Sequence, residues 1–153
     1  MGVPILTACA GFLLAVLWMD LMFDSQAGLR GPDPDESTLA SIGAYYHRAT
    51  TTSQPMGTLI AAVMGTLLVG LAIEAWRGER PGWVLIASAV LAGGPILLAM
   101  LRTVPSAVRL GRRGDTSAEQ SRLARTIYRD HVVCLVGMAA FLLLWLTVAV
   151  WSW

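Results

Sequence analysis

The sequence contains no lysine, only two cysteines and few charged residues of any kind. Charged residues make up 14% of its 153 positions, whereas a soluble domain carries roughly 25%. Because 56% of the residues are hydrophobic, the chain has too little polar surface to dissolve as a water-soluble domain. The formal net charge of +1 indicates neither a basic nor an acidic partner.

The motifs of soluble enzymes are also missing. There is no Walker box, no G-x-G-x-x-G, no G-x-S-x-G and no H-E-x-x-H, so nothing indicates a nucleotide site, a nucleophile elbow or a zinc protease. The two cysteines, Cys9 and Cys134, fall at depths that differ by roughly 15 Å at the helical rise. A disulfide requires Cα atoms within about 7 Å, so we expect two free thiols.

In place of these features the sequence has four apolar runs, at residues 3–23, 56–76, 83–101 and 132–151. Each run approaches or exceeds the ~20 residues that an α-helix needs to cross ~30 Å of hydrocarbon. Residues 1–153 are therefore predicted to form one all-α, polytopic membrane domain, a four-transmembrane-helix bundle.

The arginines are unevenly distributed among the segments that join these runs. Seven of the eleven lie between the third and fourth runs, two between the first and second, and two between the second and third. Cytoplasmic loops are enriched in arginine, so we expect insertion in the inner (plasma) membrane with both termini outside the cytoplasm. The same bias accounts for the clustered arginines, so no nucleic-acid partner is predicted. An aromatic belt at the outer interface agrees with this orientation and would contain Trp76, Trp83, Trp151 and Trp153.

A short amphipathic helix is predicted between the first two runs, over about residues 34–50. The sequence Asp33-Pro34-Asp35-Glu36 provides an acceptor at the N-cap, proline at the first helical position and glutamate at the third. We expect this helix to lie on the cytoplasmic membrane surface or against the bundle. Its apolar side contains Leu39, Ile42, Gly43, Tyr46 and Ala49.

The cytoplasmic segment 102–130 is predicted to begin as a basic loop, because Pro105 should stop or bend the third helix. A capping box, Thr116-x-x-Glu119, then starts a helix at Ser117 that runs unbroken into the membrane. Three arginines on one side of this helix are expected to meet anionic headgroups or solvent: Arg122, Arg125 and Arg129. The opposite side is expected to pack on the bundle through Leu123, Ile127, Asp130, His131 and Cys134.

Two features within the apolar runs concern helix packing. Gly57, Ala61 and Gly65 form a series of small residues that lets another helix approach closely, either within the fold or in a dimer. In the third run, Gly93-Gly94-Pro95 is expected to kink the helix.

The polar residues that are candidates for a functional site all fall on the inner side of the membrane. Asp20 lies about one turn inside the boundary, where a carboxylate is costly unless it faces the bundle or water, and Asp24 shares its helix face. An apolar pocket between the helices, open at the inner face, would bind a ligand through Asp20, Tyr46, His47 and Arg102. His131 is the natural proton acceptor at neutral pH, and the candidate catalytic residues are His131, Asp130 and Arg102.

Other interpretations of these residues remain open. Snorkelling and ion pairing at the membrane boundary account for them without any function. His131 and Cys134 would supply two metal ligands, but zinc sites need three or four, so no metal site is predicted. His47 and His131 are the only histidines and are candidates for axial haem ligands. No haem motif accompanies them, and no cofactor is predicted.

Two stretches and the overall layout carry a family resemblance. They are Arg102-Thr103-Val104-Pro105-Ser106-Ala107-Val108-Arg109-Leu110, after the third run, and Arg125-Thr126-Ile127-Tyr128-Arg129-Asp130-His131, at the entry to the fourth. Over most of its length the chain resembles the small four-span bacterial membrane proteins grouped with anthrone oxygenases. The chain has neither the Asn after Pro105 nor the Trp before the fourth run that this family shows. The resemblance implies cofactor-independent oxygenation of a polycyclic phenol, with His131 as the base.

The residues themselves favour a non-catalytic function: a small scaffold or accessory subunit that binds a lipid-like molecule or a partner helix. The alternative is a membrane enzyme that acts on a hydrophobic substrate at a cytoplasmic-face pocket. Expected partners are the lipid bilayer, a hydrophobic small molecule, and further copies of the chain or a larger membrane complex. The arrangement of Asp20, Arg102 and His131 distinguishes these functions. If the three side chains converge on one cavity, binding or catalysis is favoured; if they pair off in a packed interior, a scaffold is favoured.

Overall fold

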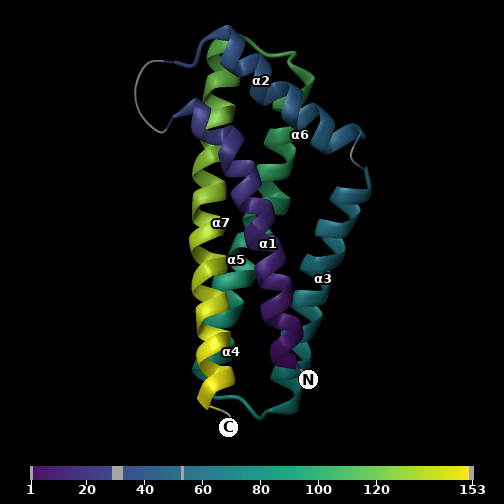
Figure 1. Cartoon of the computed structure of the whole chain (residues 1–153), viewed down its shortest axis with the longest axis vertical. Helices are drawn as coiled ribbons and strands as arrows, with labels where there is room; N and C mark the ends of the chain where they lie inside the picture. Colours follow the sequence, from purple (N-terminus) through teal and green to yellow (C-terminus); the bar gives the residue numbers. More distant parts are fainter. Residues whose placement is uncertain (1, 29–32, 53, 152–153) are drawn as a thin grey trace.

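Four helical segments span the bundle in a computed structural model, which describes residues 2–28, 33–52 and 54–151 (Figure 1). All four are long and apolar enough to cross a membrane. The prediction of an all-α four-helix bundle is therefore confirmed, and the fold is that of a multi-pass membrane protein. The spanning segments are Gly2–Ala27, Pro55–Arg77, Gly82–Arg112 and Ser117–Val150.

The first, second and fourth spans are each formed by one long helix, and the third by three shorter helices in series. The long helices are α1 (Gly2–Asp24), α3 (Gln54–Arg77) and α7 (Ser117–Trp151). The third span consists of α4 (Gly82–Ser88), α5 (Gly94–Leu98) and α6 (Val104–Arg112).

The remaining helix, α2 (Glu36–His47), lies across one end of the bundle and packs on α6 and α7 (Figure 1). Its N-cap is Asp35, which accepts a hydrogen bond from the Thr38 backbone N–H at 2.7 Å. The hydrogen bonds from Thr38 and Ser37 lower the pKa of the Asp35 carboxyl. The helix therefore begins two residues after the predicted start at residue 34. The predicted apolar stripe is confirmed by the burial of Leu39, Ile42, Gly43 and Tyr46.

Three π-helical turns, Arg48–Thr52, Ala89–Gly93 and Ala99–Thr103, each end shortly before a proline. Proline has no N–H, and its ring collides with the carbonyl four residues earlier. A wider turn with i→i+5 bonding relieves that collision, and in the third span helical segments continue on both sides of each such turn. The interruption predicted at Gly93-Gly94-Pro95 thus takes the form of a π turn.

The prediction of a basic loop that begins at residue 102 is wrong, because most of this stretch is helical. Pro105 sits in the first turn of α6, after a π turn, and the helix continues to Arg112. Arg113 then ends it with a left-handed backbone conformation at φ 52°. The predicted helix start at Ser117 is confirmed.

The arginine side of α7 also differs in part from the prediction. Arg122 is largely exposed and pairs with Glu119 at 2.6 Å, as expected of a solvent-facing residue. Arg125 is mostly buried and pairs with Asp33 at 3.2 Å, because the segment before α2 brings that carboxylate over α7. The predicted packing side of the helix is buried as expected at Leu123, Ile127, Asp130, His131 and Cys134.

The buried apolar side chains form two clusters, one between the spanning helices and one under α2. Phe141 and Trp145 of α7 are fully buried in the first cluster, and Trp145 Nε1 donates to Ser88 Oγ at 2.9 Å. Glycine permits close approach in both: a Cβ added at Gly137 would lie 2.8 Å from the Pro95 ring, and one at Gly111 would lie 2.8 Å from the backbone of α2. The second cluster contains Leu39, Ile42, Tyr46, Leu110, Leu123 and Ile127.

α3 is the least buried of the four spans. It packs on α1 and, at its far end, on α4. A Cβ added at Gly57 or Gly65 would meet no atom of the described chain within 4 Å. The close helix approach predicted for Gly57, Ala61 and Gly65 is therefore absent from the described part of the chain.

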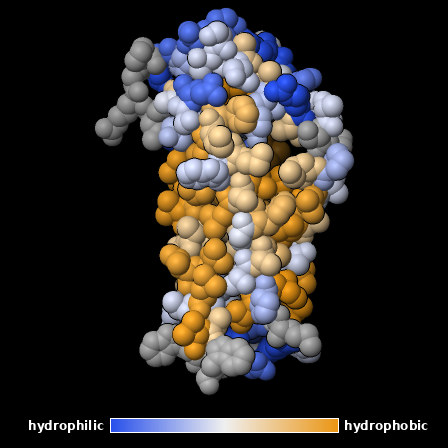
Figure 2. All heavy atoms as spheres, viewed as in Figure 1, coloured by the Kyte–Doolittle hydropathy of each residue, from blue (hydrophilic) through white to orange (hydrophobic). Residues whose placement is uncertain are grey.

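The end of the bundle opposite α2 holds both chain termini (Figure 1) and a buried carboxylate. Glu74 is buried and pairs with Arg77 at 3.3 Å and with Arg80 at 3.1 Å. Trp76 and Trp83 are strongly exposed at this end, whereas the Trp151 side chain and Trp153, also predicted for the aromatic belt, lie outside the described residues. Figure 2 shows a wide apolar belt between this end and the hydrophilic end that α2 covers.

Candidate functional site

Asp24, Tyr46 and His131 meet where α1, α2 and α7 come together. Asp24 is 0% exposed, and each of its oxygens accepts one hydrogen bond. Tyr46 Oη donates to Oδ1 at 2.6 Å, and His131 Nδ1 lies 2.6 Å from Oδ2. Because a carboxylate accepts hydrogen bonds, the Nδ1 position carries the proton. This bond fixes the orientation of the imidazole and leaves Nε2 on its other side.

Asp20 lies one turn earlier in α1 and faces the same imidazole. Its Oδ1 accepts a hydrogen bond from Tyr45 Oη at 2.5 Å, and the Tyr45 ring stacks on Phe23 at 4.0 Å between ring centroids. Asp20 Oδ2 lies 3.9 Å from His131 Nε2, which is too far for a hydrogen bond. Among the residues that the structure describes, both of these atoms therefore keep unused hydrogen-bonding capacity.

The two tyrosines hold the carboxylates in place from α2. Burial, together with the negative charge of Asp24, raises the pKa of Tyr46 far above its usual range. Burial and the charge of Asp20 likewise raise the pKa of Tyr45. Both phenols therefore stay protonated and act as hydrogen-bond donors to their partners.

Arg102 pairs with Asp130 beside this group. Arg102 Nε donates to Asp130 Oδ2 at 2.9 Å and its Nη2 donates to Oδ1, a two-point contact between planar groups. Thr103 Oγ1 donates to Asp130 Oδ2 at 3.2 Å. Asp130 is buried, so the pair neutralises its charge. Arg102 and Asp130 therefore form a structural ion pair with each other.

A cavity of about 600 Å³ lies between α3 and the third span. A smaller one of about 140 Å³ continues from it toward Pro95, and Asp20, His131 and Thr103 line both. The walls are mostly apolar, with polar groups gathered at the α2 end. The α3 wall of the larger cavity is formed by Gly57, Thr58, Ile60, Ala61 and Met64.

The small residues of α3 thus border space in which an apolar molecule fits. The π turns border it as well: Ala49 and Thr50 come from the turn after α2, and Ala99 and Thr103 from the turn before α6. Such turns are frequent at functional sites because they redirect side chains. The arrangement suits a molecule with an apolar body and one polar end.

The sequence-predicted site residues fall into two groups. Asp20, Tyr46 and His131 line the cavity, as predicted for a ligand site. His47 is exposed and borders a different hollow, formed with α6. Arg102 and Asp130 bond each other and are not among the lining residues.

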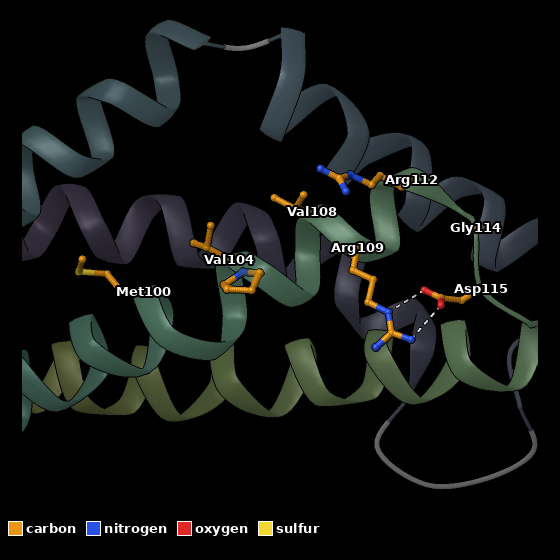
Figure 3. A pocket seen from close by; sticks show the side chains of 8 residues that line it. Met100, Val104, Val108, Arg109, Arg112, Gly114 and Asp115 are labelled. Atoms are coloured by element: carbon orange, nitrogen blue, oxygen red, sulfur yellow. Dashed lines mark hydrogen bonds and ion pairs between the residues drawn. The ribbon is translucent and has the colours of Figure 1, made fainter.

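A further hollow of about 650 Å³ lies on the outer side of α6 (Figure 3). Its Arg109 is already bonded to Asp115, with Nε–Oδ2 and Nη2–Oδ1 distances of 2.9 and 2.8 Å, and it also contacts Glu119. This guanidinium holds the pKa of the Asp115 carboxyl below its usual range. The hollow therefore offers apolar side chains, an arginine already paired with acidic residues, and Arg112.

Metal and haem chemistry find no support in the positions of the candidate ligands. Over residues 2–28, 33–52 and 54–151, no three His, Cys, Asp or Glu side chains gather as a metal-binding group. Cys134 donates to the Pro95 carbonyl at 3.6 Å. His47 and His131 border different hollows, so the structure does not bring these two predicted haem ligands to one site.

The residues predicted for the site did not include Tyr45 or Thr103, and Asp24 was a candidate only through the helix face that it shares with Asp20. The i, i+4 spacing of Asp20 and Asp24 and the adjacent tyrosines 45 and 46 were the available signals. No family model, curated protein or solved structure matches this chain. The cavity and the groups around it therefore provide the evidence on function.

Proposed function

We propose that this membrane protein binds a lipid-like small molecule, with an apolar body and a polar end, in the cavity between α3 and the third span. The observation that carries the proposal is the convergence of Asp20 and His131 on one mostly apolar cavity. Asp20 and His131 each bond one other side chain and still present a second polar atom to the cavity, whereas Arg102 and Asp130 pair with each other and do not line it.

The weak packing of α3 supports the same function. Its inner surface borders the cavity along Gly57, Thr58 and Ala61, and α3 contacts the bundle chiefly through α1. A molecule dissolved in the bilayer can therefore enter beside α3 without passing through water.

Two neighbouring alanines of α3 provide a matched test. Ala61 lines the cavity and Ala62 does not. Native mass spectrometry of the detergent-purified chain should detect a bound molecule of less than phospholipid mass. Ala61→Trp should remove that mass by filling the cavity, and Ala62→Trp should retain it. No bound small molecule, or equal retention in both variants, would contradict the proposal.

A second candidate function is proton abstraction from a bound hydrophobic substrate, as in the oxygenation of a polycyclic phenol. The His131–Asp24 bond favours it, because a carboxylate that holds Nδ1–H leaves Nε2 as a base facing the cavity. With an anthrone as substrate, oxygen uptake should disappear in His131→Gln while bound substrate is retained. Absence of oxygen uptake by the unaltered protein would leave binding as the function.

We further propose that the α2 end faces the cytoplasm at the inner (plasma) membrane. The arginines of α6 and α7 gather at this end, and the termini lie at the other (Figure 1), in keeping with the positive-inside bias. The open surface of α3 around Gly65 leaves room for a second copy or another membrane protein.

A further inference from the structure

Four hydroxyl donors around the polar end of the cavity are already committed. Tyr46 donates its hydroxyl proton to Asp24, and Tyr45 donates to Asp20. Thr50 donates to the Tyr46 carbonyl at 2.7 Å, and Thr103 donates to Asp130. What these groups leave toward a ligand is acceptor lone pairs.

The formal charge around the polar end is also one-sided. Asp20, Asp24 and Asp130 contribute three carboxylates, against the guanidinium of Arg102 and the imidazole of His131. Even with a charged imidazole, the group keeps one negative charge. No arginine lines either cavity, although seven arginines lie in the adjoining segment.

Two atoms face each other across the end of the cavity without bonding. His131 is only 8% exposed, and its Nε2 has no hydrogen-bond partner within the described chain. Asp20 Oδ2 lies 3.9 Å from it. A nitrogen that carries two or more N–H bonds, placed beside both, can donate one N–H to each at ordinary hydrogen-bond length, with the imidazole neutral at Nε2.

From this geometry we infer that the ligand is a cationic amphiphile, an alkyl or aryl amine whose ammonium lies between Asp20 Oδ2 and His131 Nε2. The inference rests on the proposed function and names the ligand class of that same cavity. The ammonium supplies several N–H donors and one positive charge, and the apolar body occupies the space along Ala61 and Val104. A charge-assisted hydrogen bond is roughly twice as strong as a neutral one, so the site distinguishes an amine from an alcohol of equal length.

The test compares decylamine, decanol and decanoate on the full chain in phosphatidylcholine nanodiscs, with isotope-labelled histidine. The protein has two histidines, and His47 lies outside the cavity, so its signals are an internal control. Decylamine should shift the His131 Nε2 resonance and bind about tenfold more tightly than decanol, a difference of ~1.4 kcal/mol. Decanoate should bind more weakly than either.

Asp20→Asn keeps an acceptor for Tyr45 and removes the charge, so it should bring the affinity for decylamine down to that for decanol. Asp33→Asn removes an exposed carboxylate at the same end of the molecule and should keep the preference. Equal or tighter binding of decanol or decanoate by the unaltered protein would overturn the cationic ligand and leave the cavity as a binding site. If none of the three shifts His131, the proposed function itself fails.

Discussion

Asp24 Oδ2 and His131 Nδ1 lie 2.6 Å apart, although 107 positions separate the two residues in the chain. This contact joins the end of the first span to the start of the membrane-embedded part of the fourth. It also determines which imidazole nitrogen faces the cavity. The same bond therefore serves both the packing of α1 on α7 and the chemistry of the site.

Removal of the Asp24 carboxylate should be strongly destabilising. Asp24→Ala leaves the Tyr46 hydroxyl and His131 Nδ1 without their buried acceptor, and breaking a buried polar pair in this way costs about 3–5 kcal/mol. Asp20→Ala should cost less, about 1 kcal/mol, since Asp20 is partly exposed and makes one hydrogen bond. Chemical unfolding in detergent measures both, and equal losses would contradict the central position of Asp24.

Stability should fall in alkaline solution because of Tyr45 and Tyr46. Their pKa values are raised in the folded protein, whereas an unfolded tyrosine ionises near pH ~10. The stabilisation is complete below that pH, and it declines as the pH rises above it because the unfolded state loses protons that the folded state keeps. Thermal unfolding of the wild type and the Tyr45→Phe/Tyr46→Phe double variant at increasing alkaline pH tests this. A slope that the double variant leaves unchanged would rule out these two residues as its source.

Two glycine substitutions should have opposite effects on stability. Gly57→Ala places a Cβ in open space, and the better helix propensity of alanine should stabilise by about 0.5–1 kcal/mol. In Gly137→Ala the Cβ lies 2.8 Å from the Pro95 ring and 3.0 Å from the Leu91 carbonyl oxygen, which should destabilise by about 1–3 kcal/mol. Unfolding midpoints of the two variants provide the comparison. Destabilisation by Gly57→Ala would show that another helix covers this face of α3.

The orientation proposed for the bundle has its own test. A reporter fused after Trp153 should be active outside the cytoplasm, and one inserted at Gly114, between α6 and α7, should be active inside. Replacing Arg77 and Arg80 should not change this result, because most arginines lie at the α2 end. Cytoplasmic activity of the Trp153 fusion would reverse the assignment.

The spans could be predicted because hydropathy over some twenty residues is a local property of the sequence. The same holds for the apolar side of α2 and for the helix start at Ser117. Pro105 was misjudged because its effect depends on the preceding turn. A proline ends a regular α-helix, but a widened turn accommodates it.

The site could be predicted only in part, because helix rotation and crossing decide which polar groups meet. Asp20, Tyr46 and His131 were expected near one another, and they share a cavity. That Arg102 would bond Asp130 instead of facing the cavity depends on how the third span turns against α7. The exposure of His47 has a similar cause, since α2 crosses α6 closely at Gly111.

The π turn at Ala99–Thr103 has a consequence for how the cavity wall changes with chain length. An i→i+5 turn holds one more residue than an α-helical turn, so deletion of one residue there restores a regular helix. The segments on either side of the turn then keep their facing relative to one another, because only the extra residue of the wide turn is lost. The deletion instead returns the Pro105 ring to collision with the carbonyl four residues earlier, so a single-codon deletion would bend the span beside Ala99 and Thr103 of the cavity wall.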